Sequence, residues 1–242
     1  MRERVDRQPA FVLHERAYRE TSAILELLTR DHGRVAVVAR GLRAPRPRFS
    51  RGSLRALQPV ECDWIGQGEM GLLVAVEATA LPIAAAGVQL QSALYVNELL
   101  VRLLARHDPH PKLFDAYAGL LANLPGDHAA LGFALRRFEV QLLAELGYGI
   151  DFAWDLSSRS VVLPEQHYRV DPEQGVFAAT GPGRGAVSGR ALLALGGDQL
   201  PAADALADLR RMMRSLLLHH LGGRELNAWR VLRSPVRPAD PV

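Results

Sequence analysis

The chain has 242 residues, a net charge of +3 and an apolar fraction of 48%, a composition typical of a globular protein with one large core or two to three small ones. Its single cysteine, Cys62, excludes an intrachain disulfide and any multi-cysteine zinc site. No signal peptide and no apolar run of transmembrane length is visible, so we expect a cytoplasmic protein.

The first part of the chain predicts a small β-barrel. Residues 1–8 are charged and without pattern, so we expect regular structure to begin near Pro9. Five β-rich runs follow, separated by polar or glycine-containing turns, at residues 10–14, 22–29, 34–39, 57–65 and 72–77. Five strands within about 70 residues favour a closed barrel, and the OB-fold is a common barrel of this kind that binds single-stranded nucleic acid.

The most basic part of the chain extends from the third of these runs to the start of the fourth, and most of its arginines lie on the loop between them. Residues 32–60 contain no acidic residue and seven arginines, namely Arg34, Arg40, Arg43, Arg46, Arg48, Arg51 and Arg55. A loop cannot bury so many guanidinium groups, so they must face water or a phosphate backbone. A solvated arginine-rich loop is the alternative to a nucleic-acid site.

A second basic segment lies near the end of the chain. Residues 209–239 carry seven arginines against Glu225 alone, which leaves the rest of the chain strongly acidic. This asymmetry is typical of a protein that docks on nucleic acid with one face. The further candidates for DNA contacts that we take from this segment are Arg210, Arg214 and Arg224.

After residue 81 the apolar residues recur with a helical period. They predict three amphipathic helices of a bundle, at residues 89–106, 111–123 and 129–146. Asn97 falls within the apolar stripe of the first helix, so we expect a buried, hydrogen-bonded amide. Arg136 and Glu139 are expected towards the flank of the third helix.

The helical period is lost again at about residues 152–189, where a small β insertion with a hairpin is predicted around Asp171-Pro172. Helices resume at 189–195, 202–221 and 225–233. The sequence therefore predicts an α+β fold. A five-stranded OB-fold barrel that binds nucleic acid would occupy residues 1–80, and an α-helical domain that carries the insertion would occupy 81–242.

No arrangement of residues in the sequence indicates catalysis. His219 and His220 are adjacent on a helix and point about 100° apart, and the acidic residues do not cluster as a two-metal nuclease requires. We predict no catalytic residue, no metal and no cofactor. The alternatives are a helical adaptor whose basic loop binds an acidic protein partner and, more remotely, a nuclease with a dispersed site.

Several strings resemble one family when taken in order. AFVLHERAYRETSAILELLTRDHGRVAVVARGLR, ALYVNELLVRLL, ALRRFEVQLLAELGYGIDF and LHHLGGRELNAWRVLR together resemble the RecO family of bacterial DNA repair proteins, over about Phe11–Arg233. The resemblance implies an OB-fold followed by a helical domain, which in some members holds a four-cysteine zinc site in the insertion. Here the insertion has no cysteine and only His167 as a candidate ligand, so it resembles the zinc-free branch and must be held by packing.

The resemblance also implies a function without bond-breaking chemistry. Members of the family bind single- and double-stranded DNA without sequence preference and anneal complementary strands coated with single-stranded DNA-binding protein (SSB). With RecR they help to load the RecA recombinase, an activity expected at the nucleoid. The barrel region contains few aromatic residues, so we expect its DNA affinity to come mainly from phosphate contacts.

A further implied partner is the acidic C-terminal tail of SSB, which calls for a cation beside an apolar pocket. By match to the family's motif, the string LRRFE places this site at Leu135, Arg136 and Arg137, with Arg136 as the carboxylate contact. The alternative is that both arginines are surface charges that pair with Glu139 or Glu145.

Overall fold

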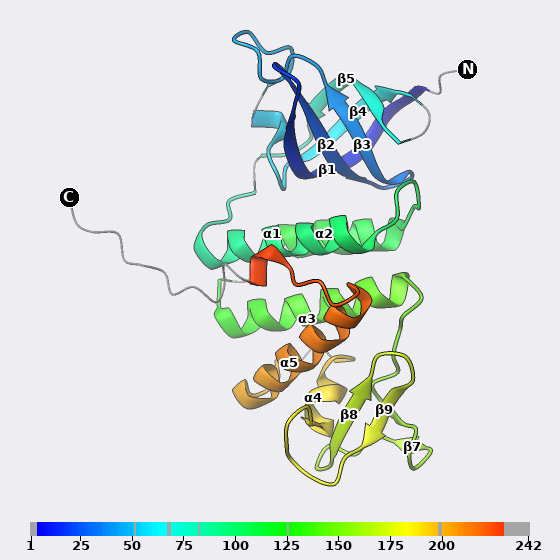
Figure 1. Ribbon diagram of the computed structural model, residues 1–242. Coiled ribbons are helices and arrows are strands. Elements are labelled where there is room, and N and C mark those ends of the chain that lie inside the picture. Colours follow the sequence, from blue (N-terminus) through cyan, green and yellow to red (C-terminus); the bar gives the residue numbers. More distant parts are fainter. Residues whose placement is uncertain are drawn as a thin grey trace, which may run out of the picture. The chain divides into compact units, whose positions relative to one another are not determined.

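The computed structural model describes residues 4–50, 52–66, 69–81, 83–124, 126–197 and 200–229 (Figure 1). The chain forms two compact units. The first comprises the described parts of Met1–Pro109 and Arg224–Val242, and the second is His110–Gly223. No helix among the described residues is long and apolar enough to cross a membrane.

The first unit contains a closed five-stranded barrel, which confirms the fold class predicted from the sequence. Its strands are β1 (Arg4–Tyr18), β2 (Ser22–Thr29), β3 (Gly33–Ala39), β4 (Pro59–Ile65) and β5 (Gly71–Ala78). They are ordered β1-β2-β3-β5-β4, and β1 closes the barrel by pairing with both β2 and β4. Neighbouring strands are antiparallel except β3 and β5, which pair in parallel. The apolar residues that alternate along these strands fill the interior of the barrel.

Strand β1 begins earlier than the sequence pattern predicts. Regular pairing already starts at Arg4, which lies opposite Ile65 of β4, whereas residues 1–8 were expected to lack structure. The register of β1 against β4 shifts between Val5 and Gln8, and Arg7 within this bulge has a φ of 50°. The bulge disturbs the polar–apolar alternation, so the first residues of the strand carry no recognisable pattern.

Helix α1 (Gly87–Leu103) packs against β1 and therefore belongs to the barrel unit. The pairing of β1 with β2 skips Leu13, which makes this residue the extra one of a second bulge. Asn97 of α1 is 3% exposed, and its Nδ2 donates to the carbonyl oxygen of Leu13 at 2.9 Å. The predicted buried and satisfied amide is thus confirmed, and it attaches the helix to the barrel. The change from strands to helices near residue 80 therefore precedes the boundary between the two units.

The second unit contains helices α2 (Pro111–Ala122), α3 (His128–Glu145), α4 (Gly189–Ala194) and α5 (Ala203–His220). Both α2 and α5 pack against α3, and α4 packs against α5. Asp127 caps α3 by accepting a hydrogen bond from the N–H of Ala130 at 2.8 Å. The bounds agree with the predicted helices to within a few residues. The last predicted helix, residues 225–233, lies only partly within the described residues, where residues 227–229 are helical.

One expectation about α3 is wrong. Arg136 and Glu139 do not lie on the exposed flank of the helix, because they are 8% and 0% exposed. They form an ion pair with each other one helical turn apart. The ion pair offsets part of the free-energy cost of burying two charges. The periodicity of apolar residues could not indicate that these two charged residues are buried.

The predicted insertion is a small five-stranded sheet, ordered β10-β8-β9-β6-β7. Its strands are β6 (Trp154–Asp155), β7 (Ser160–Val161), β8 (His167–Asp171), β9 (Gly175–Ala178) and β10 (Val187–Ser188). β8 and β9 form the predicted hairpin, and β7 overlaps a β-rich run expected at residues 161–163, whereas β6 and β10 were not predicted. Within the described parts of the chain, no three His, Cys, Asp or Glu side chains are placed to hold a metal ion.

Packing and a buried carboxylate hold this sheet together. Tyr168 and Val176 belong to an apolar cluster that also includes Leu192 of α4 and Leu209 of α5. Asp155 accepts hydrogen bonds from Ser158 Oγ at 2.6 Å and from the N–H groups of Ser157, at 2.9 Å, and Ala178, at 3.1 Å. Burial opposes ionisation of this carboxyl group, but the hydrogen bonds prevail and lower the pKa of Asp155.

Candidate nucleic-acid interface

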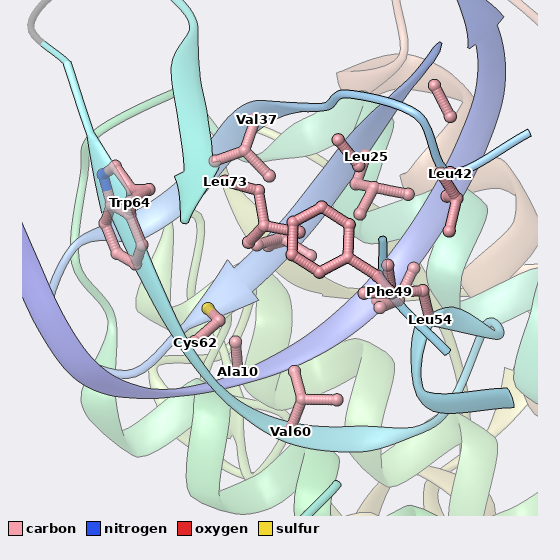
Figure 2. Close-up of a cluster of buried hydrophobic side chains, with 14 of the residues drawn as sticks. Ala10, Leu25, Val37, Leu42, Phe49, Leu54, Val60, Cys62, Trp64 and Leu73 are labelled. Atoms are coloured by element: carbon pink, nitrogen blue, oxygen red, sulfur yellow. The ribbon is translucent and has the colours of Figure 1, made fainter. Parts of the chain in front are cut away.

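The segment between β3 and β4, residues 40–58, is a loop firmly anchored in the barrel. Leu42, Phe49 and Leu54 are buried in the same apolar cluster as Leu25 and Leu73 of the barrel strands (Figure 2). Leu54 lies at the end of a short 3-10 helix, Gly52–Leu54. We call residues 40–58 the arginine loop. Its apolar residues point inward, so its arginines are left on the outside.

The described arginines of this loop are exposed and have no acidic partner among the described residues. Five of the arginines predicted to contact DNA lie on the described part of the loop, and none of them forms an ion pair with a described carboxylate. They are Arg40, Arg43, Arg46, Arg48 and Arg55. Arg48 Nη2 donates to the carbonyl oxygen of Val74 at 3.2 Å, and its guanidinium lies 5.3 Å from the centre of the Phe49 ring. The remaining candidate, Arg51, lies outside the described residues.

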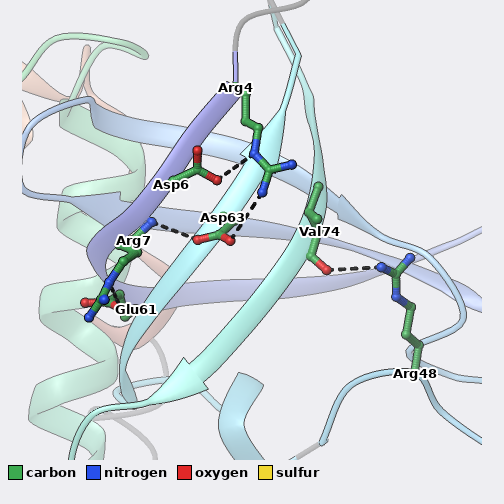
Figure 3. A network of polar contacts seen from close by, with 7 residues as sticks. All are labelled: Arg4, Asp6, Arg7, Arg48, Glu61, Asp63 and Val74. Carbon is green, nitrogen blue, oxygen red and sulfur yellow. Dashed lines mark hydrogen bonds and ion pairs between the residues drawn. The ribbon is translucent and has the colours of Figure 1, made fainter.

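Arginines near the beginning of β1 contrast with those of the loop (Figure 3). Arg4 Nε lies 2.6 Å from Asp6 Oδ1, and Arg7 Nε lies 2.9 Å from Glu61 Oε1. The backbone N–H of Arg7 also donates to Asp63 at 2.7 Å. Positive charge is therefore compensated by carboxylates around Arg4 and Arg7 and left uncompensated along the arginine loop, which makes the loop the stronger candidate for a polyanion.

A groove of about 1130 Å³ adjoins the base of the arginine loop. Arg40 lines it together with Tyr18, Arg19 and Met70, from the β1–β2 and β4–β5 connections. The guanidinium of Arg19 lies 5.1 Å from the centre of the Tyr18 ring. Of the four aromatic residues in the barrel region, Phe11, Phe49 and Trp64 are buried, whereas Tyr18 is partly exposed. The groove thus offers one aromatic face, two cations and the carboxylate of the exposed Glu20.

Sequence reasoning did not identify Tyr18, Arg19 or Met70 as site residues. They come from two turns that are distant in the sequence and become neighbours only when the barrel closes. The one available signal was the pair Tyr18-Arg19, an aromatic residue next to a cation at a predicted turn.

Arg34 differs from the other candidates because it has a structural role. Its side chain is 14% exposed, and Nη1 lies 2.8 Å from Glu26 Oε2. Its Nε donates to the carbonyl oxygen of Leu104 at 3.1 Å, while Arg106 Nη2 lies 2.5 Å from the other oxygen of Glu26. Gly33, with a φ of 65°, lets Asp108 approach so closely that a Cβ there would lie 2.1 Å from its carbonyl oxygen. Arg34 therefore fastens the segment after α1 to the barrel, and we leave it out of the proposed interface.

The later candidates lie in different units. Arg210 is exposed on α5, and Arg214, four residues on, is half-buried. Arg211 pairs with Asp208 and so carries less free charge. Arg224 is exposed and belongs to the first unit, whereas the α5 arginines belong to the second.

The residues predicted to bind the SSB tail lie in the middle of α3. Leu135 and Arg136 are both buried, at 8% exposure each, and Arg137 is exposed. Arg136 pairs with Glu139, as the alternative from the sequence supposed, but it is buried and is not a surface charge. Glu145 Oε2 lies 3.9 Å from His110 Nδ1. An acidic tail would have to compete with Glu139 for Arg136.

Comparison with known proteins identifies the family. The family model described as Recombination protein O N terminal matches residues 1–81, and that described as Recombination protein O C terminal matches residues 86–230. The chain belongs to the RecO family.

Curated relatives agree over nearly the whole chain. The DNA repair protein RecO of Aromatoleum aromaticum is 44% identical over 235 residues, which cover 96% of this chain and 97% of the relative. RecO of Xanthomonas campestris pv. campestris is 41% identical over 238 residues, covering 96% and 98%. RecO of Azoarcus sp. (strain BH72) is 42% identical, covering 96% and 97%. Membership of the RecO family supports a role in DNA repair and recombination.

Proposed function

We propose that this RecO-family chain binds DNA through the arginine loop and the adjoining groove, without sequence preference and without bond-breaking chemistry. The observation that carries the proposal is a set of exposed guanidinium groups on a loop whose apolar residues are buried in the barrel. They belong to Arg40, Arg43, Arg46, Arg48 and Arg55 and have no carboxylate partner in the part of the chain that the structure describes. A rigid base keeps these charges together, so phosphates can bind without first ordering the whole segment. No contact to a base edge is required.

The groove supports binding of a single strand in particular. Tyr18 would provide a face on which an unpaired base stacks, and Arg19 and Arg40, which line the same groove, would contact the neighbouring phosphates. With only one partly exposed aromatic residue in the barrel, stacking contributes little, and counterion release from phosphate contacts dominates.

The salt dependence of binding tests the proposal. If the loop neutralises about five phosphates, the logarithm of the affinity for a single strand falls with the logarithm of salt concentration at a slope of about −3.5. Replacing Arg43, Arg46 and Arg48 together by alanine should flatten the slope by about 2 and weaken all sequences alike. The matched control replaces Arg7, an exposed arginine already paired with Glu61. An unchanged slope in the triple variant would place the site elsewhere, first at Arg210, Arg214 and Arg224.

The wider activity is part of the same proposal. We infer that the chain is a recombination mediator that anneals complementary strands coated with SSB and acts with RecR to load RecA at the nucleoid. Residues 1–80 would then supply the principal DNA contact and residues 81–242 would serve partner proteins, with Leu135, Arg136 and Arg137 at the SSB tail. Annealing of SSB-coated complementary oligonucleotides, measured with and without the protein, tests this. Failure to bind random DNA in a gel shift would favour an adaptor for an acidic protein.

A further inference from the structure

A pocket in the second unit is lined by none of the individual residues that the proposed function names. Its volume is about 520 Å³, and its walls come from the segment after α3, strands β6 and β9, the turn before β9 and the end of α5. All these elements belong to one compact unit, so the pocket does not depend on how the two units are arranged.

Large apolar side chains are unusually exposed in this pocket. Tyr148, Trp154 and Leu156 all line it, and they are 49%, 41% and 40% exposed. The Tyr148 ring stacks on His220 of α5, with ring centres 4.2 Å apart and planes inclined by 21°, so the aromatic wall is held in place. Large apolar side chains are seldom clustered on the surface of a protein that has no partner there. Such a cluster around one hollow therefore indicates a binding site.

The charge of the pocket restricts its occupant. Asp151 and Glu173 line it and are exposed, and the described lining contains no lysine or arginine. Burial and the neighbouring His219 lower the pKa of His220, so this imidazole is neutral near pH 7 and adds no positive charge. His219 Nε2 lies 3.4 Å from Glu173 Oε1, yet the Glu173 side chain remains 75% exposed and can accept a second donor.

We propose that this pocket binds a basic peptide segment of a partner protein, one that presents an arginine or lysine next to an aliphatic residue. The cation would lie over the faces of Trp154 and Tyr148 and receive hydrogen-bonding oxygens from Asp151 and Glu173. The aliphatic neighbour would pack on Leu156. A nucleic acid fits less well, because its phosphates would meet two carboxylates. The same argument disfavours an acidic tail, so the site is distinct from the one proposed on α3.

A short synthetic peptide tests the proposal on the full-length protein. The probe is a fluorescein-labelled peptide with a central Leu-Arg-Leu in neutral Gly and Ser flanks, and its binding is followed by fluorescence anisotropy at low and moderate salt. We expect saturable binding that weakens about two- to five-fold in Trp154→Ala, as loss of an exposed cation–π contact implies. The double variant Asp151→Asn/Glu173→Gln should bind about ten-fold more weakly.

Matched controls separate the site from general effects of charge and folding. Glu165 is an exposed carboxylate of the same unit outside the pocket, so Glu165→Gln should leave peptide affinity unchanged. Trp154→Phe retains an aromatic face and should restore most of the affinity that Trp154→Ala loses. Equal affinity of wild type and the double variant would overturn the proposal. Tighter binding of a Leu-Glu-Leu peptide than of the Leu-Arg-Leu peptide would also overturn it. So would an oligonucleotide that displaces the peptide from the wild type but not from Trp154→Ala, because a single strand would then occupy the pocket.

Discussion

Replacing Arg34 by alanine separates an arginine that stabilises the barrel from arginines that bind DNA. Arg34 lies in the most basic segment of the sequence, but its guanidinium contacts Glu26 Oε2 at 2.8 Å and the carbonyl oxygen of Leu104 at 3.1 Å. We expect Arg34→Ala to lower stability and leave the affinity for DNA unchanged.

The size of the effect follows from what remains after the substitution. A hydrogen bond to a charged group contributes about 1.5–3 kcal/mol, and removing one partner of a buried ion pair costs about 3–5 kcal/mol. Arg34→Ala leaves Glu26 with Arg106 as a partner, so we expect a loss of about 2 kcal/mol. Glu26→Ala leaves two guanidinium groups without their carboxylate, and its cost should approach about 3–5 kcal/mol.

Two measurements on the same variants check this reasoning. Thermal unfolding should shift down by about 4–8 °C in Arg34→Ala, and hydrogen exchange of residues 22–39 should locate the loss in the barrel. Anisotropy of a labelled single strand across a range of salt concentrations should give the wild-type slope. Arg16→Ala, at an exposed position of β1, is the matched control for removal of one positive charge.

The opposite pair of results would refute the argument. If Arg34→Ala kept the wild-type melting temperature while the salt slope flattened by about 0.7, one phosphate contact would have been lost. Arg34 would then be a DNA contact, as its position in the sequence suggests, and the ion pair with Glu26 would contribute nothing measurable.

Three further outcomes are expected. Burial raises the pKa of the Cys62 thiol to about 12, so Cys62 should not react with a thiol reagent at pH 8 until the protein unfolds. Because the thiol ionises at a lower pH in the unfolded chain, the free energy of unfolding should fall as pH rises from 9. Rapid labelling of the native protein would contradict the burial of this thiol. The purified protein should contain no stoichiometric zinc and keep its melting temperature in chelator, whereas one zinc per chain on metal analysis would show that the insertion was misread. Arg136→Ala should weaken binding of an SSB tail peptide about ten- to a hundred-fold at a temperature where the variant is folded, and equal affinity would remove Arg136 from that site.

Local pattern was sufficient to predict the order and type of the main elements. The barrel strands, the hairpin of β8 and β9 and the long helices each extend over several periods of apolar residues, so their signal survives without knowledge of the rest of the chain. The position of the arginine loop between two strands could be read in the same way, whereas the burial of its apolar anchors came only from the tertiary structure. Its density of arginine already indicated a polyanion.

The partners of individual charges were decided only by the tertiary structure. Arg34 and Arg43 look alike in the sequence, but Glu26 lies beside Arg34 across a strand pair, and Arg106, 80 residues from Glu26, completes the cluster. Arg136 was predicted on the flank of a helix and is buried against Glu139. The groove at Tyr18 and the pocket at Trp154 each combine distant segments. Periodicity describes one element at a time, whereas burial and charge pairing depend on which elements meet.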